Sequence, residues 1–152
     1  FYTLFGDIAF RQNRTEEAFA YYDKALENNP QNYGALNNYS YYLALLGKNL
    51  DKAERMSGEV IKANPDNATY LDTYAWVYFK QGRYSLARLY LKKALDLSKE
   101  ASAEMYEHYG DVLAVTGNES EAVGWWKKAV DAGGDSEILH RKIAEKRYIG
   151  NE

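Results

Sequence analysis

His108 and His140 are the only histidines in the chain, and imidazole is the side chain used most often for proton transfer and metal binding. Glu107 and Asp111 flank His108 at positions i and i+4 of a predicted helix, so their carboxylates share one face. His108 is offset from Glu107 by about 100° around the helix axis and points away from that face. No second histidine stands at ligand spacing. The sequence therefore predicts no metal site, with both histidines on solvated helix surfaces.

Other arrangements for catalysis or cofactor binding are missing from the sequence. The chain has no cysteine, which excludes disulfides and thiolate metal sites. The Gly133–Gly134 pair lacks the strand and the lysine of a phosphate-binding loop. Ser57 and Ser85 have no partner nearby and look like ordinary helix residues. We therefore expect no enzyme activity, no catalytic residue and no cofactor, which leaves the surface as the functional part of the molecule.

Composition indicates about one ordinary globular domain. The chain has 152 residues, of which 46% are hydrophobic and 27% charged, and its formal net charge is −3. The negative balance argues against nucleic acid as the partner. No run reaches the roughly 18 apolar residues of a membrane span, so we expect no direct membrane insertion. Because the first residue is Phe1 rather than methionine, we expect a piece of a longer protein.

Two series of small residues recur along the chain. The first series has spacings of 34, 35 and 35 and consists of Gly6, Ser40, Ala75 and Gly110. The second has spacings of 35, 34 and 35 and consists of Ala18, Ala53, Ala87 and Ala122. A turn residue stands seven positions after each member of the first series, at Asn13, Gly47, Gly82 and Gly117. Small side chains suit places where two helices cross, because axes about 8–10 Å apart leave little room.

The two series predict four helical hairpins followed by one more helix. Repeat 1 covers residues 1–30 with a truncated start, repeat 2 covers 31–66, repeat 3 covers 67–100, repeat 4 covers 101–134, and a capping helix covers 135–150. Thr15 is a plausible N-cap for the second helix. Asp135 or Ser136 should cap the last helix, which we expect to reach about Tyr148.

This pattern resembles the tetratricopeptide repeat family, whose units of about 34 residues form two antiparallel helices. The resemblance covers nearly the whole chain. It implies an all-α fold, a right-handed α-α superhelix (TPR solenoid) of four helical hairpins plus a C-terminal capping helix. Segments such as YLDTYAWVYFKQGRY also look like those of bacterial proteins of envelope or lipoprotein type. That likeness implies a bacterial protein of the cell envelope, either periplasmic or a lipoprotein.

In this family the first helix of each unit lines a concave surface that contacts protein partners. The resemblance places the following residues on that surface: Asp7, Asn37, Asn38, Tyr41, Asp72, Trp76, Phe79, Glu107 and Asp111. Such a lining is acidic and aromatic, which suits a protein or peptide with basic and apolar anchors. It implies a non-enzymatic scaffold for a protein partner. The aromatic residues could instead pack between neighbouring helices, and the acidic ones could serve only solubility.

Other functions stay open at this point. One branch of the family clamps the C-terminal carboxylate of chaperones with Lys, Asn and Arg, and of the corresponding positions here only Asn38 matches. We therefore predict no binding of chaperone tails. The chain could also be a structural or self-assembly module that forms a homodimer through its uncapped N-terminal end. A further alternative is an accessory part of an enzyme whose catalytic residues lie outside this stretch.

The last predicted helix has a narrow apolar stripe formed by Leu139 and Ile143, and a mostly basic remainder that includes Lys142. The end of a helical stack requires an element that covers the last apolar face and presents a polar one. We therefore expect this helix to be a polar cap. Contact with acidic lipid or nucleic acid is the alternative, and such contact would weaken in moderate salt.

Overall fold

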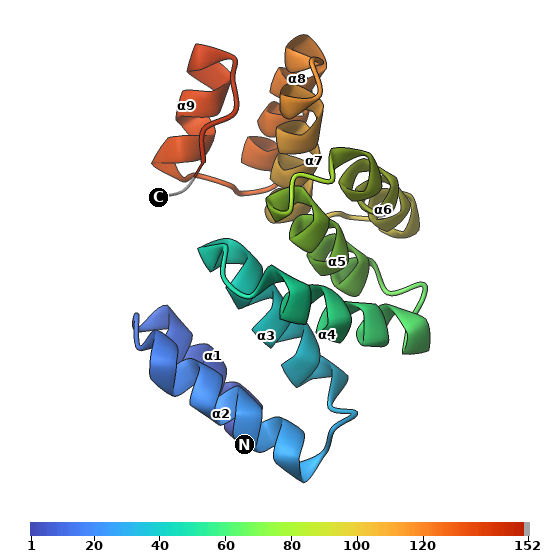
Figure 1. Ribbon diagram of the computed structural model, residues 1–152. Coiled ribbons are helices and arrows are strands. Elements are labelled where there is room, and N and C mark those ends of the chain that lie inside the picture. The colour runs from blue at the N-terminus through green and yellow to red at the C-terminus, as the bar shows by residue number, and fades with distance from the viewer. Residues whose placement is uncertain (151–152) are drawn as a thin grey trace.

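The computed structural model describes residues 1–150, and the regular structure of this part of the chain is entirely helical. Its helices are α1 (Tyr2–Arg11), α2 (Thr15–Asn28), α3 (Tyr33–Leu46), α4 (Leu50–Ala63), α5 (Ala68–Lys80), α6 (Tyr84–Leu97), α7 (Ala103–Val115), α8 (Glu119–Asp131) and α9 (Glu137–Glu145). Four hairpins, α1/α2 to α7/α8, stack upward from the N-terminal end in Figure 1, and α9 packs beside α8. The predicted all-α solenoid is confirmed. None of the described helices is both long and apolar enough to span a membrane.

Each hairpin turns on a residue with a left-handed backbone conformation. Asn13, Gly47, Gly82 and Gly117 have φ angles of 62°, 65°, 78° and 91°. Glycine adopts this region readily because it has no Cβ, and asparagine is one of the few other residues that tolerate it. The turn positions predicted from the spacing are therefore confirmed, including the one occupied by asparagine.

The small residues of the two series lie where the helices of a hairpin cross. A Cβ on Gly6 would stand 2.7 Å from Cε1 of Tyr22, and one on Gly110 would stand 2.6 Å from Nε1 of Trp126. Ala87, from the second series, is fully buried. A large aromatic ring on the second helix therefore requires a residue without a side chain on the first.

Aromatic stacking joins successive hairpins and accounts for many of the 15 tyrosines. Phe19 and Tyr22 of α2 both stack on Tyr39 of α3, with ring centroids 5.1 Å and 5.5 Å apart. Aromatic pairs of this kind add about 0.5–1.5 kcal/mol beyond the burial of their surface. Burial and a hydrogen bond donated to Asp7 raise the pKa of Tyr22 far above its ordinary value. These rings are packing residues, as expected for the core positions.

Two expectations about helix ends are wrong. Thr15 is the first residue of α2, and the preceding N-cap residue, Arg14, makes no capping bond with its side chain. The last helix begins as expected, with Ser136 Oγ accepting a hydrogen bond from the backbone of Leu139. It ends at Glu145 rather than near Tyr148, because Lys146 takes a left-handed conformation with φ of 56°. The chain therefore leaves the helical path after α9 and runs back toward α5, where Tyr148 packs against Phe79.

Candidate functional site

A cavity of about 670 Å³ lies between α3, α5, α7 and the C-terminal part of the chain. We call it the main cavity. Its lining consists of Tyr41, Leu45, Trp76, Lys80, Glu104, Glu107, His108, Asp111, Ser136, Glu137, Ile138, Lys142, Tyr148 and Ile149. The first helices of three successive hairpins thus form one wall, and α9 with the residues after it forms the other.

A smaller cavity of about 290 Å³, which we call the side cavity, shares Tyr41 and Glu104 with the main one. Its lining consists of Asn37, Asn38, Tyr41, Thr69, Asp72, Thr73, Ser102, Glu104 and Met105. Asn37 is 6% exposed, and its Oδ1 accepts no hydrogen bond from the described residues. A buried carbonyl oxygen without a donor is energetically unfavourable. A hydrogen-bond donor bound in the side cavity would therefore be stabilised by the Asn37 oxygen.

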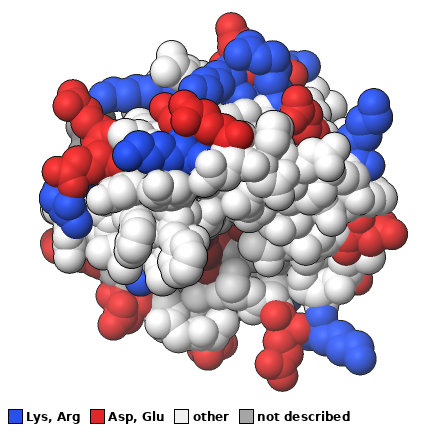
Figure 2. All heavy atoms as spheres, turned by 90° about the horizontal axis from the view of Figure 1, so that it is seen from below, with Lys and Arg blue, Asp and Glu red and all other residues white. Residues whose placement is uncertain are grey.

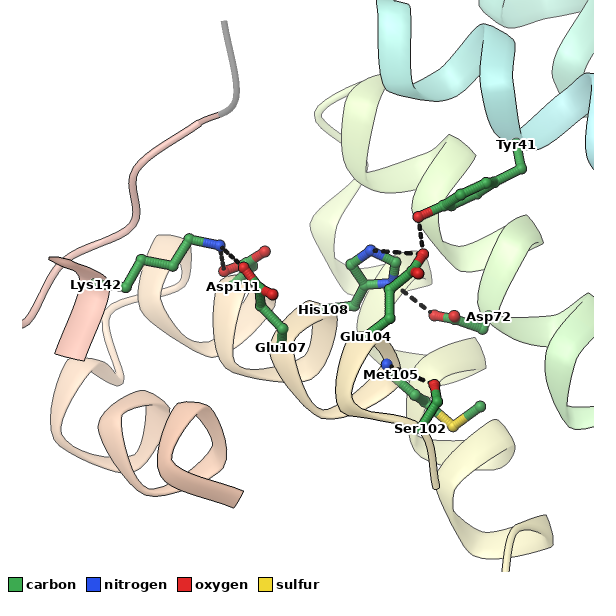
Figure 3. A network of polar contacts seen from close by, with 9 residues as sticks. All are labelled: Tyr41, Asp72, Ser102, Glu104, Met105, Glu107, His108, Asp111 and Lys142. Atoms are coloured by element: carbon green, nitrogen blue, oxygen red, sulfur yellow. Dashed lines mark hydrogen bonds and ion pairs between the residues drawn. The ribbon is translucent and has the colours of Figure 1, made fainter. Parts of the chain in front are cut away.

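A chain of polar contacts links the two cavities across three helices (Figure 3). His108 Nδ1 lies 2.8 Å from Asp72 Oδ1, and its Nε2 lies 3.9 Å from Glu104 Oε1. The hydroxyl of Tyr41 donates a hydrogen bond to the same Glu104 oxygen. Burial lowers the pKa of His108, but the charge and hydrogen bond of Asp72, together with Glu104 and Asp111, outweigh this effect and raise it above the ordinary value.

Aromatic rings back this polar chain. Trp76 stacks between His108 and Phe79, with centroid distances of 3.8 Å and 4.3 Å. Tyr148, beyond the end of α9, packs edge-on against Phe79 at 5.4 Å. These stacked rings fix the orientation of the imidazole and leave the Nε1 atom of Trp76 without a hydrogen-bond partner among the described residues.

A second charged cluster ties α9 to α7. Lys142 Nζ lies 2.6 Å from Glu107 Oε2 and 2.8 Å from Asp111 Oδ1, and Trp126 Nε1 donates to the same Asp111 oxygen at 3.0 Å. Burial raises the pKa of Asp111 to about 6, although Lys142 opposes the shift. Lys142 is only 2% exposed. The expectation that the basic side chains of the last helix are all part of a solvated polar face is therefore wrong for this residue.

His108 is not the solvated residue that the sequence predicted, because it is 5% exposed and contacts Tyr41 of α3 and Trp76 of α5. Glu107 and Asp111 do share a face of α7, but they hold Lys142 rather than flank the imidazole. The imidazole faces the carboxylate of Asp72, which lies 36 positions earlier in the chain. His140 is exposed, as predicted.

The structure divides the nine residues predicted to contact a partner into distinct groups. Tyr41, Trp76, Glu107 and Asp111 line the main cavity. Asn37, Asn38, Tyr41 and Asp72 line the side cavity. Phe79 lies behind Trp76, and Asp7 is used within the fold, where it accepts hydrogen bonds from Tyr22 and Asn38.

The sequence analysis missed several residues of this site, chiefly Glu104, Lys142 and Tyr148. Glu104 could have been found, since it stands four residues before His108 and therefore one helical turn away. Lys142 and Tyr148 had no such signal. Their positions depend on where α9 docks and where it ends, and neither follows from a repeat pattern that stops before them.

Charge is unevenly distributed on the face shown in Figure 2. Uncharged side chains cover most of its middle, acidic side chains are visible in a hollow there, and charged side chains of both signs lie toward the edge. Within the main cavity, Glu104 is exposed and Glu107 is half-buried. The accessible part of the lining is therefore acidic, with aromatic rings beside it.

These features define the class of protein: a solenoid of helical hairpins whose first helices line a cavity closed by a terminal helix. Models of the tetratricopeptide repeat match residues 9–77 and 73–137. The chain therefore belongs to the tetratricopeptide repeat family, as the sequence predicted.

Relatives occur in archaea and bacteria. A TPR repeat-containing protein of Methanocaldococcus jannaschii is 32% identical over 134 residues, which is 88% of this chain and 23% of that protein. Another, from Pseudomonas aeruginosa, is 32% identical over 82 residues, which is 54% of this chain and 14% of that protein. The chain thus spans less than a quarter of the length of these relatives.

Solved structures share the fold. PilW, a widely conserved type IV pilus biogenesis factor, superposes with a TM-score of 0.81 at 22% identity, covering 95% of this chain and 66% of that one. PilF of Pseudomonas aeruginosa gives 0.78 at 20% identity, covering 95% and 65%. YrrB, a TPR protein with an unusual peptide-binding site, gives 0.64 at 23% identity, covering 95% and 74%.

Proposed function

We propose that this chain is a non-enzymatic scaffold that binds a peptide or protein segment along its concave surface, with the main cavity as the principal contact. The observation that carries the proposal is the combination of accessible carboxylates and aromatic rings in one cavity, with Glu104 and Glu107 beside Tyr41 and Trp76. Membership of a family of interaction scaffolds supports it, and YrrB provides a peptide-binding example of the same fold.

The expected partner segment carries lysine or arginine together with an aromatic or aliphatic side chain. A cation is attracted both by carboxylates and by aromatic faces, at about 0.5–1 kcal/mol for an exposed cation–π contact. The chain contains its own example of an apolar anchor here, because Tyr148 packs on Phe79 at the edge of the main cavity. Of the predicted residues that line the main cavity, Tyr41 and Glu107 are partly exposed, whereas Trp76 and Asp111 are buried.

Selection of binders from a random peptide library tests the proposal. We expect enrichment of peptides that combine basic and apolar residues, and a loss of affinity of at least tenfold for the Glu104→Gln/Glu137→Gln variant, which changes two exposed glutamates of the main cavity. Glu119→Gln/Glu121→Gln is a matched control, because both glutamates are exposed on α8 outside the main cavity. Enrichment of acidic peptides, or equal loss in the control, would contradict the proposed surface.

Self-association is a second candidate function, favoured by an exposed apolar stripe on α1. Leu4, Phe5 and Ile8 are 57%, 44% and 38% exposed, and their spacing places them on one side of the helix. A second copy could cover this stripe. Sedimentation at several concentrations should then give a dimer that Leu4→Glu abolishes and that Leu89→Glu, at an exposed leucine of α6, leaves intact. A monomer at all concentrations would exclude this function.

A further inference from the structure

We propose that His108 and Glu104 form a binding site for a divalent transition-metal ion such as Zn²⁺, with Asp72 holding the imidazole in position. Neither the family nor the repeat pattern implies such a site. It borders the main cavity and shares Glu104 with the proposed peptide contact. The sequence reasoning predicted no metal here because it considered only Glu107 and Asp111, which the structure assigns to Lys142.

The three side chains meet from two helices of different hairpins. Asp72 on α5 and both Glu104 and His108 on α7 place one potential ligand atom each within 4.8 Å of the others. Imidazole and carboxylate are the ligand types that zinc and neighbouring first-row metals accept together. This set combines nitrogen and oxygen donors. Among the described residues it is the one group of at least three potential metal-ligating side chains that lie this close together.

The two ring nitrogens of His108 have different roles. Nδ1 is 2.8 Å from Asp72 Oδ1, the distance of a hydrogen bond, so this nitrogen is engaged. Its partner atom, Nε2, is directed at Glu104 (Figure 3). A carboxylate on one imidazole nitrogen with a metal on the other is a recurrent arrangement, in which the carboxylate fixes the ring and raises its basicity as a ligand. Asp72 is accordingly a positioning residue rather than a ligand.

The distance between the two ligand atoms fits an ion between them. Zinc binds imidazole nitrogen and carboxylate oxygen at about 2.0–2.2 Å, which places the two atoms about 3.3 Å apart at a tetrahedral angle and about 4.1 Å apart when they are opposite each other. The observed separation of Nε2 and Oε1 is 3.9 Å. The Glu104 side chain is 53% exposed and can move slightly to close the angle, whereas the imidazole is held by its stacking on Trp76.

The surroundings provide further oxygen donors and space for water. The Tyr41 hydroxyl contacts the Glu104 carboxylate, and the buried Oδ1 of Asn37 has no donor in the side cavity that Glu104 and Asp72 also line. Because the chain supplies two ligands and zinc takes four, the remaining positions stay open to water or to a donor from a bound partner.

Calorimetric titration of the tag-free chain with ZnCl₂ tests the site, and MgCl₂ serves as the comparison ion, because magnesium prefers an all-oxygen octahedral shell. We expect one Zn²⁺ per chain and no comparable binding of Mg²⁺. Glu104→Gln should weaken zinc binding at least tenfold, and Asp72→Asn should weaken it by about 10–100-fold, as is typical for an outer-shell partner. Far-ultraviolet circular dichroism would check that Glu104→Gln, at a half-exposed side chain, retains the fold.

The second histidine provides the matched control. His140 is exposed, so His140→Ala should leave zinc affinity unchanged. The same variant assigns the imidazole signals in a nitrogen-15 spectrum, because the signals that remain belong to His108. Zinc should then shift Nε2 of His108 selectively. The proposal is overturned if wild type binds no zinc, if His140→Ala removes the binding, or if Glu104→Gln binds as tightly as wild type.

Discussion

Replacement of Lys142 by methionine would remove the positive charge that ties α9 to α7. Methionine keeps much of the length of the lysine side chain, so packing changes little and the loss of charge dominates. Lys142 is 2% exposed, and its ammonium lies within 2.8 Å of carboxylate oxygens of both Glu107 and Asp111. The substitution therefore leaves two carboxylates without their shared cation.

The two carboxylates differ in what they lose. Asp111 is also 2% exposed and keeps Trp126 Nε1 as its donor among the described residues, whereas the Glu107 side chain is 22% exposed and can be hydrated in part. Removal of one partner of a buried ion pair typically costs about 3–5 kcal/mol. Because Asp111 can take up a proton instead of remaining charged, we expect a loss of about 2–4 kcal/mol in the free energy of unfolding.

Urea unfolding near neutral pH, followed by circular dichroism, measures this loss. Lys127→Met is the matched control, since it removes the same charge from an exposed position of α8 and should change stability by no more than about 0.5 kcal/mol. In the double variant Asp111→Asn/Lys142→Met no charge is left buried at that position, so it should be more stable than the sum of the single changes predicts, by about 1–3 kcal/mol. Equal stability of the Lys142 and Lys127 variants would refute the reasoning.

Three further outcomes are expected from the packing and the charges. Gly110→Ala should destabilise the fold by about 1–3 kcal/mol, because its Cβ would stand 2.6 Å from Trp126, whereas Gly124→Ala, with no atom within 4 Å, should stabilise it by up to about 1 kcal/mol. Ala87→Leu should overpack a fully buried crossing and lower the thermal midpoint, at a cost of about 1–3 kcal/mol. Burial raises the pKa of Asp111 to about 6, above the ~3.9 of an exposed aspartate. The folded state therefore favours protonated Asp111. This contribution to stability is complete below about pH 4 and is lost as the pH rises toward about 6, so wild-type stability should fall across that range relative to Asp111→Asn in urea titrations.

The sequence predicted the fold well because hairpin geometry is a local constraint repeated along the chain. A crossing needs a small residue wherever a large ring faces it, as Gly110 and Trp126 demonstrate. Each turn needs a residue with a left-handed backbone conformation, and Asn13 adopts it where the other units use glycine. Four copies of each requirement made the register unambiguous. The end of α9 was less predictable, since no repeat constrains Lys146.

The site was less predictable because its contacts join helices that are distant in sequence. Asp72 and His108 are 36 positions apart, and Glu107 and Lys142 are 35 apart. A helical projection of α7 alone places Glu107 and Asp111 on one face but does not indicate what lies opposite. The direction of His108 depends on α5, and the role of Lys142 depends on how α9 docks.

Burial also changes which predicted residues are available for recognition. Asp72, Trp76 and Asp111 are at most 9% exposed, and the two carboxylates among them are already engaged by partners within the fold. Their side chains hold the hairpins together, so substituting them would alter stability and binding at once. Binding of a partner must instead depend on the accessible groups at the edge of the main cavity, such as Glu104 and Tyr41. Because these two also belong to the His108 contacts, a partner's cation and a metal ion would compete for the same carboxylate, and zinc should weaken the binding of basic peptides.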